Sequence, residues 1–147
     1  MTKPLLVILL LLPLSISAGE LDGKGIFCES NQEIPRGYTF NFGIVMGDLP
    51  QVIGLEVHVK KEGLEYPMEY REFARKVQWS QPTVIYTLNR QSLQLQAEEI
   101  SADGKSVTTK FWQCKSYQDI KKYEARLDEA VSEIQASLKR DMTDNKI

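Results

Sequence analysis

The chain has 147 residues and a formal charge of −2, from 18 basic and 20 acidic side chains, and its hydrophobic fraction of 42% is enough for a packed core. The slightly acidic total, without a basic block, argues against nucleic acid and anionic lipid as main partners. A single histidine excludes sites that need two imidazoles, and two cysteines cannot form a four-thiolate zinc centre. We therefore expect neither a metal nor any other cofactor.

Residues 1–18 have the order of an export signal. Lys3 gives a positive start, an uninterrupted apolar run follows from Leu5 to Leu12, and small residues lead up to Ala18. The run is shorter than the roughly 20 apolar residues that a membrane-spanning helix needs. We expect a signal peptide over 1–18, no stable membrane anchor, and a periplasmic or secreted mature protein.

Hydrophobic alternation with a period of two predicts an antiparallel β domain over residues 19–115. The strand-like runs cover residues 38–46, 53–59, 83–88, 92–97 and 107–114. Turn chemistry separates them at residues 47–50, 62–63, 89–92 and 102–105, where Asp103-Gly104 is the clearest hairpin turn. Short links between successive strands indicate a meander, and about seven strands on this spacing predict a small barrel or sandwich.

Two features of this domain do not fit a simple series of regular strands. Gly43 falls within the second strand-like run, where it indicates a β-bulge or a close backbone approach. Residues 64–76 alternate like a strand, with Pro67 typical of an edge position. The same segment also reads as a short helix that begins at Pro67, with glutamates early and basic residues late. Both interpretations of 64–76 stay open.

The period changes to that of an amphipathic helix after Cys114. Apolar residues recur from Tyr117 to Leu138, and Ser116 with Asp119 forms a candidate capping box. We expect a long C-terminal helix over 116–140 and a flexible tail over 141–147. The helix either returns onto the sheet of its own domain, which we favour, or supports self-association through its apolar stripe.

The two cysteines, Cys28 and Cys114, are isolated and span the β domain. In an oxidising compartment, such a pair predicts one structural disulfide. A redox pair would place its cysteines close together, as in C-x-x-C, which this chain lacks.

Candidate catalytic residues are few. His58 is expected on the solvent face of its strand beside Glu56, and no G-x-S-x-G nucleophile elbow accompanies it. The acidic residues Glu62, Glu65, Glu69 and Glu72 lack the D-x-D-x-D-G pattern of a calcium loop and are expected on a solvated face. We therefore expect a protein that is not an enzyme.

Large aromatic residues are frequent in the β domain. Candidates to line a ligand cavity inside the sheet are Tyr38, Phe40, Phe42, Trp79 and Tyr86. The same residues are equally suited to fill a compact core, which is the interpretation that we favour. The sequence thus predicts an exported binding or interaction module whose partner is an unknown protein. The alternative is a lipocalin-like carrier of a small apolar ligand inside a barrel.

Overall fold

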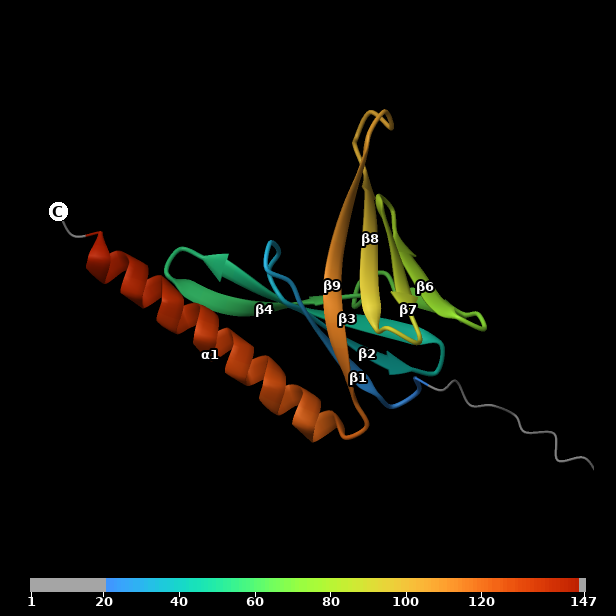
Figure 1. The fold of residues 1–147 in the computed structure, drawn as a ribbon, viewed down its shortest axis with the longest axis horizontal. Helices are drawn as coiled ribbons and strands as arrows, with labels where there is room; N and C mark the ends of the chain where they lie inside the picture. Colours follow the sequence, from blue (N-terminus) through green and yellow to red (C-terminus); the bar gives the residue numbers. More distant parts are fainter. Residues whose placement is uncertain (1–20, 146–147) are drawn as a thin grey trace, which may run out of the picture.

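The computed structural model describes residues 21–145, so the expected signal peptide lies outside the described residues. These residues form nine strands followed by one helix (Figure 1). The strands are β1 (Gly25–Glu29), β2 (Arg36–Asn41), β3 (Ile44–Ile53), β4 (Glu56–Glu62), β5 (Met68–Glu72), β6 (Lys76–Gln81), β7 (Val84–Asn89), β8 (Gln94–Ile100) and β9 (Val107–Tyr117). The helix α1 covers Ile120–Asp144.

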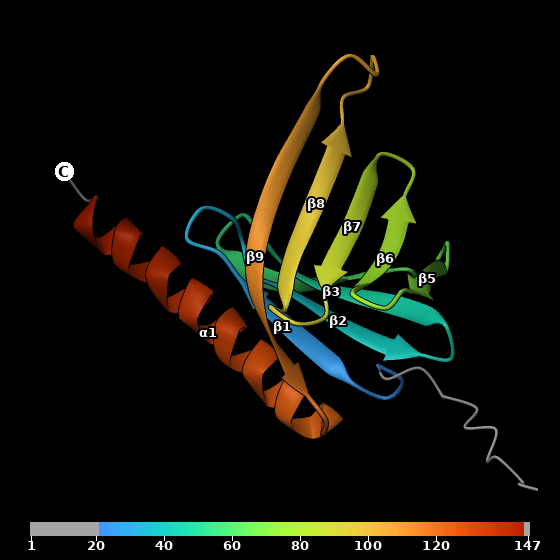
Figure 2. The ribbon, with the colours of Figure 1, turned by 45° about the vertical axis from the view of Figure 1, so that its right-hand side comes forward.

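Eight of these strands close into an antiparallel barrel, which decides between the barrel and the sandwich. The order around the barrel is β2-β1-β9-β8-β7-β6-β5-β3, and β2 also pairs with β3, so the ring of strands is continuous. The first strand therefore lies beside the last, while β6 to β9 stand side by side as one wall (Figure 2). The prediction of a small β barrel followed by a C-terminal helix is confirmed.

The run 38–46, expected to be one strand, is a hairpin instead. Phe42 and Gly43 form its two-residue turn with φ angles of 48° and 79°, and Asn41 pairs with Ile44 across it. Across a two-residue turn, each even-numbered residue pairs with an odd-numbered one. The inward-pointing residues are therefore even-numbered before the turn and odd-numbered after it. Val45 is accordingly fully buried. The expected bulge at Gly43 is wrong, because its positive φ serves this turn.

The run 53–59 contains a second such hairpin, between β3 and β4. Its turn is Gly54-Leu55, and Ile53 pairs with Glu56 across it. Residues 47–50, expected as a turn, lie inside the ten-residue strand β3. Beyond Asp48, β3 no longer pairs with β2, so the distal part of β3 and β4 forms a two-stranded ribbon that leaves the barrel.

Residues 64–76 contain strand and no helix. β5 pairs with the start of β3 and with β6, and a short turn between Glu72 and Lys76 joins β5 to β6. The expected turns at 89–92 and 102–105 are confirmed, since they connect β7 to β8 and β8 to β9.

The helix α1 packs on β1, β9 and β4, as favoured from the sequence (Figure 1). It begins later than expected, because β9 continues to Tyr117 and Asp119 is the N-cap that accepts from the backbone N–H of Lys121. Residues 141–144, expected in a flexible tail, are helical. Residues 146–147 lie outside the described part.

Within residues 21–145, no helix is long and apolar enough to span a membrane.

Candidate functional site

Four of the five aromatic residues predicted to line the barrel meet in its interior. The rings of Tyr38 and Trp79 lie 5.0 Å apart edge to face, and those of Trp79 and Tyr86 stack at 5.5 Å. Phe40 contacts Trp79 with ring centroids 5.6 Å apart. These separations are those of rings in direct contact, so the side chains pack against one another across the barrel axis.

The fifth predicted residue, Phe42, does not line the barrel. It sits in the hairpin turn between β2 and β3 and is 86% exposed. The prediction for Phe42 is wrong because simple alternation along β2 makes residue 42 point inward, whereas the turn exchanges the inward and outward positions there.

Arg36 is an interior residue that was not predicted. It lies on the inward face of β2 with its guanidinium 4.6 Å from the Trp112 ring, and it donates a 2.9 Å hydrogen bond to Tyr86 Oη. Burial lowers the pKa of Arg36, but Tyr38 and Tyr86 outweigh this effect and raise it overall. In the sequence, the alternation of Arg36, Tyr38 and Phe40 is the pattern that indicates an inward-pointing Arg36. Cation–π contact stabilises this buried charge in place of an acidic partner.

Two polar atoms in the interior have no hydrogen-bond partner among the described residues, namely Tyr38 Oη and Trp79 Nε1. Burial is the main cause that raises the pKa of Tyr38, so its hydroxyl stays protonated. The barrel interior is thus a packed core in which five aromatic residues lie among aliphatic ones and the disulfide.

The predicted disulfide joins Cys28 on β1 to Cys114 on β9. The two residues are direct cross-strand partners in the register of these strands. The bond therefore fastens the first barrel strand to the last, at the seam where the barrel closes.

The remaining chemical candidates are His58 and the acidic residues Glu62, Glu65, Glu69 and Glu72. His58 is exposed on β4, with Nε2 3.5 Å from Glu56. Of the four acidic residues, Glu62 accepts a hydrogen bond from Gln81 at the end of the barrel. Among residues 21–145, no group of three or more His, Cys, Asp or Glu side chains is placed to hold a metal ion.

A buried polar cluster anchors α1 to the barrel. Asp48 on β3 is 1% exposed, and its carboxyl group accepts hydrogen bonds from Tyr123 on α1 and Lys61 on β4. Tyr123 lies directly on the backbone of two glycines, since a Cβ at Gly25 would lie 2.5 Å from the Tyr123 ring and one at Gly37 would overlap its hydroxyl. Only glycine at these two positions lets the ring reach Asp48.

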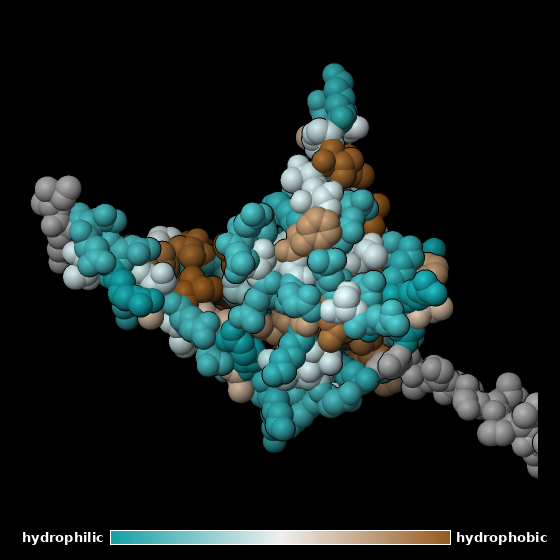
Figure 3. Space-filling view, in the orientation of Figure 1, coloured by the Kyte–Doolittle hydropathy of each residue, from teal (hydrophilic) through white to brown (hydrophobic). Residues whose placement is uncertain are grey.

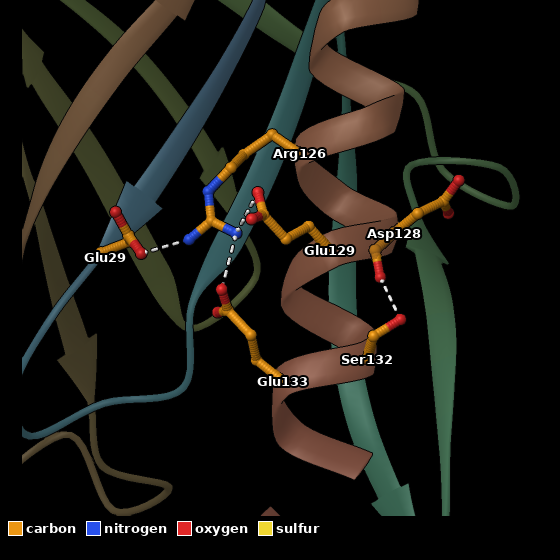
Figure 4. Close-up of polar contacts among 6 residues, drawn as sticks. All are labelled: Glu29, Arg126, Asp128, Glu129, Ser132 and Glu133. Atoms are coloured by element: carbon orange, nitrogen blue, oxygen red, sulfur yellow. Dashed lines mark hydrogen bonds and ion pairs between the residues drawn. The ribbon is translucent and has the colours of Figure 1, made fainter. Parts of the chain in front are cut away.

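Two further contacts hold α1 along its length. Arg126 packs over Phe27 and forms ion pairs with Glu29 on β1 at 2.6 Å and with Glu129 and Glu133 of the helix (Figure 4). Gln135 accepts from the Val57 N–H and donates to the backbone carbonyl of residue 55, so it covers part of the outer edge of β4. The helix thus belongs to the rigid body of the domain.

Apolar side chains are exposed at the end of the β3–β4 ribbon. Figure 3 shows them gathered beside α1, and they include Val52, Ile53 and Leu55. The C-terminal part of α1 adds the half-buried residues Ile134 and Leu138 and the exposed Met142.

A different region of the outer surface is hollowed. Phe111 on β9 points outward and is 48% exposed, whereas its neighbour Trp112 is 2% exposed, so the two point to opposite faces. Hollows of about 550 Å³ and 280 Å³ lie against Phe111, and both are also lined by Ser30 and Asn31 of the β1–β2 loop. We refer to this region as the Phe111 hollows.

The other lining residues are four uncharged polar ones, the aromatic Trp112, and the charged residues Glu29, Glu33 and Lys110. Gln94, Gln113 and Trp112 line the larger hollow, while Gln32 and Thr109 line the smaller one. No local pattern in the sequence indicates this site, because its residues come from β8, β9 and the β1–β2 loop, which only the barrel brings together.

These observations define a class: a small closed antiparallel barrel with an aromatic core, a disulfide at the closing seam and a docked C-terminal helix. No protein-family model matches this sequence, and no curated protein or solved structure is significantly similar to it. The proposals below therefore depend on the geometry of the chain itself.

Proposed function

We propose that the protein is an exported, non-enzymatic binding module that recognises its partner with the outer surface of the barrel. One observation carries this proposal: the interior aromatic side chains pack against one another at ring-contact distances, while the Phe111 hollows open outside. A binding protein whose aromatic side chains fill its interior binds through its surface, where concave regions with an aromatic residue are favoured sites.

The disulfide supports export to the periplasm or the extracellular medium, because such bonds persist in oxidising compartments. The docked helix supports a rigid scaffold, since a surface held by Asp48, Tyr123 and Arg126 loses little conformational entropy when a partner binds. The environment of His58, exposed and paired with Glu56, supports a non-catalytic role.

The experiment separates surface binding from the carrier alternative. The chain is produced in a bacterial periplasm, purified without detergent, and weighed by native mass spectrometry. It is then titrated with cis-parinaric acid, an apolar fluorescent probe, while tryptophan emission is followed. In a Trp112→Phe variant the emission comes from Trp79, and in a Trp79→Phe variant it comes from Trp112; both side chains lie in the core, and Trp112 also borders the larger hollow.

We expect the mass of the bare mature chain and no saturable quenching of Trp79. A bound apolar molecule in the native mass spectrum, or saturable quenching of Trp79 by the probe, would overturn the proposal in favour of the carrier. Circular dichroism of both variants checks that they keep the β-sheet signal of the parent.

A further inference from the structure

We infer that the Phe111 hollows bind a neutral carbohydrate chain. This inference rests on the proposed function and names the ligand class of its surface site. Its evidence consists of the side chains around Phe111, the ion pairs that surround them, and the shape of the two adjoining hollows.

The lining groups have the chemistry that sugar rings require. An exposed aromatic ring offers a negatively polarised face on which the C–H groups of a sugar ring stack. Primary amides both donate and accept hydrogen bonds, as sugar hydroxyls do. Among residues 21–145, the side-chain amides of Asn31, Gln32 and Gln94 make no hydrogen bond, although they lie around Phe111. They are free to bind hydroxyl groups.

The charged side chains at the edge of the hollows are already paired. Lys110 Nζ lies 3.5 Å from Glu33 and 3.7 Å from Glu99. Glu29 is held by Arg126 at 2.6 Å. Lys110 faces two glutamates and Arg126 faces three, so these clusters keep a net negative charge, and a neutral ligand matches the site better than an anionic one.

The arrangement of the hollows indicates a chain of sugars. Both hollows share Phe111, Asn31 and Ser30, so they adjoin each other along β9. A single ring stacks on Phe111, and neighbouring rings on either side reach Gln94 in one hollow and Thr109 in the other. A linear oligosaccharide therefore uses more of the site than a monosaccharide does.

A peptide that adds to the edge of β9 is the competing occupant. β1 pairs with β9 from residue 113 onward, so residues 107–112 have a strand partner only in β8. The β1–β2 loop covers this edge, because Glu33 pairs with Lys110 and the carbonyl of Ile34 accepts from Trp112 Nε1. Strand addition would have to break both contacts, whereas sugar binding leaves them intact.

The test uses the oxidised mature chain and neutral oligosaccharides of defined length: cellohexaose, laminarihexaose, xylohexaose, mannohexaose and chitohexaose. Binding is measured by isothermal titration calorimetry and by Trp112 emission in the Trp79→Phe variant. An anionic galacturonate hexamer is the ligand control. We expect at least one neutral hexamer to bind, more tightly than its monosaccharide, and the galacturonate to bind more weakly.

The variants identify the site. Phe111→Ala is expected to weaken binding by about tenfold or more, because it removes the stacking surface. Asn31→Ala and Gln94→Ala are each expected to weaken it by about fivefold. Phe42→Ala is the matched control, since Phe42 is another exposed phenylalanine that lines neither hollow. It should bind as the parent does.

Three results would overturn the carbohydrate site. The first is no binding of any neutral hexamer at about 5 mM by a folded protein. The second is equal affinity of the parent and Phe111→Ala. The third is Phe111-dependent binding of extended peptides together with no binding of sugars, which leaves the surface-binding module intact. The module itself is contradicted by a bound apolar molecule in the native mass spectrum or by saturable quenching of Trp79 by the apolar probe.

Discussion

Tyr123 on α1 donates a 2.6 Å hydrogen bond to Oδ2 of Asp48 on β3, in a buried position between the helix and the barrel. Its ring covers Gly25 and Gly37, on the two strands that lie between the helix and the barrel interior. The C-terminal helix thus meets β2 and β3, which lie near the start of the domain, at one hydroxyl group.

Loss of this hydroxyl should destabilise the docked helix. Tyr123→Phe keeps the ring but leaves Asp48 with Lys61 alone, which should lower the free energy of unfolding by about 1.5–3 kcal/mol. Urea unfolding followed by circular dichroism measures the change. Tyr117→Phe is the control, since Tyr117 packs against Tyr123 by its ring alone. Equal stability of Tyr123→Phe and the parent would contradict the anchoring role.

Gly37→Ala tests whether the close approach of Tyr123 to the backbone requires glycine at residue 37. The new Cβ overlaps the Tyr123 hydroxyl, so we expect a loss of about 1–3 kcal/mol. In a Tyr123→Phe background the same substitution should cost less, because the overlapping atom is gone. A double-mutant cycle from urea unfolding measures this coupling. Strictly additive effects would mean that the two residues do not meet.

Removal of the disulfide should weaken the closure of the barrel. Cys28→Ala combined with Cys114→Ala opens a covalent loop with a sequence separation of 86 residues. The chain-entropy relation puts the loss at about 4–5 kcal/mol as an upper value. The urea midpoint of this variant should match that of the parent under reducing conditions. A parent whose midpoint does not change on reduction would contradict this role.

Phe42→Asn should stabilise the protein. Phe42 has a φ of 48° and is largely exposed, so it contributes strain to the turn and little burial. Asparagine tolerates this conformation and forms the favoured Asn-Gly hairpin turn, with an expected gain of about 0.5–1 kcal/mol. Tyr66→Asn, at an exposed loop position without positive φ, should change stability by less than about 0.5 kcal/mol. The comparison is made by thermal unfolding.

Alkaline pH should unfold the protein through its buried tyrosines. Burial, the largest cause, raises the pKa of Tyr38 and Tyr123, and nearby Asp48 raises that of Tyr123 further. The folded state therefore keeps protons that the unfolded chain releases above pH 10. The stabilisation that these protonated tyrosines contribute is fully present below pH 10. Above pH 10 the free energy of unfolding falls, by at most about 1.4 kcal/mol per pH unit for each tyrosine.

Urea unfolding at several pH values between neutrality and strong alkali measures this fall. The Tyr38→Phe and Tyr123→Phe variants should each show a shallower decline than the parent, while their tyrosinate absorbance at high pH should rise together with loss of the β-sheet signal. Identical declines in all three proteins would assign alkaline unfolding to other groups.

Local patterns in the sequence determined much of the architecture. Alternation identified β structure between Gly25 and Tyr117, the change of period identified the C-terminal helix, and the isolated cysteines predicted their own bond. Alternation failed at Phe42 and Leu55, because a two-residue turn exchanges the inward and outward positions without interrupting the pattern. The inward face of β3 was for that reason assigned to the wrong residues.

The tertiary structure alone decided which side chains from distant parts of the sequence come together. Barrel closure depends on pairing between β1 and β9, which are separated by most of the domain, and no local pattern encodes that contact. It brings Asn31, Gln94 and Phe111 together around the hollows, and Asp48 together with Tyr123 under the helix. Residue type and spacing indicate which side chains of a single strand are buried. A site that several strands form depends in addition on the register in which those strands pair.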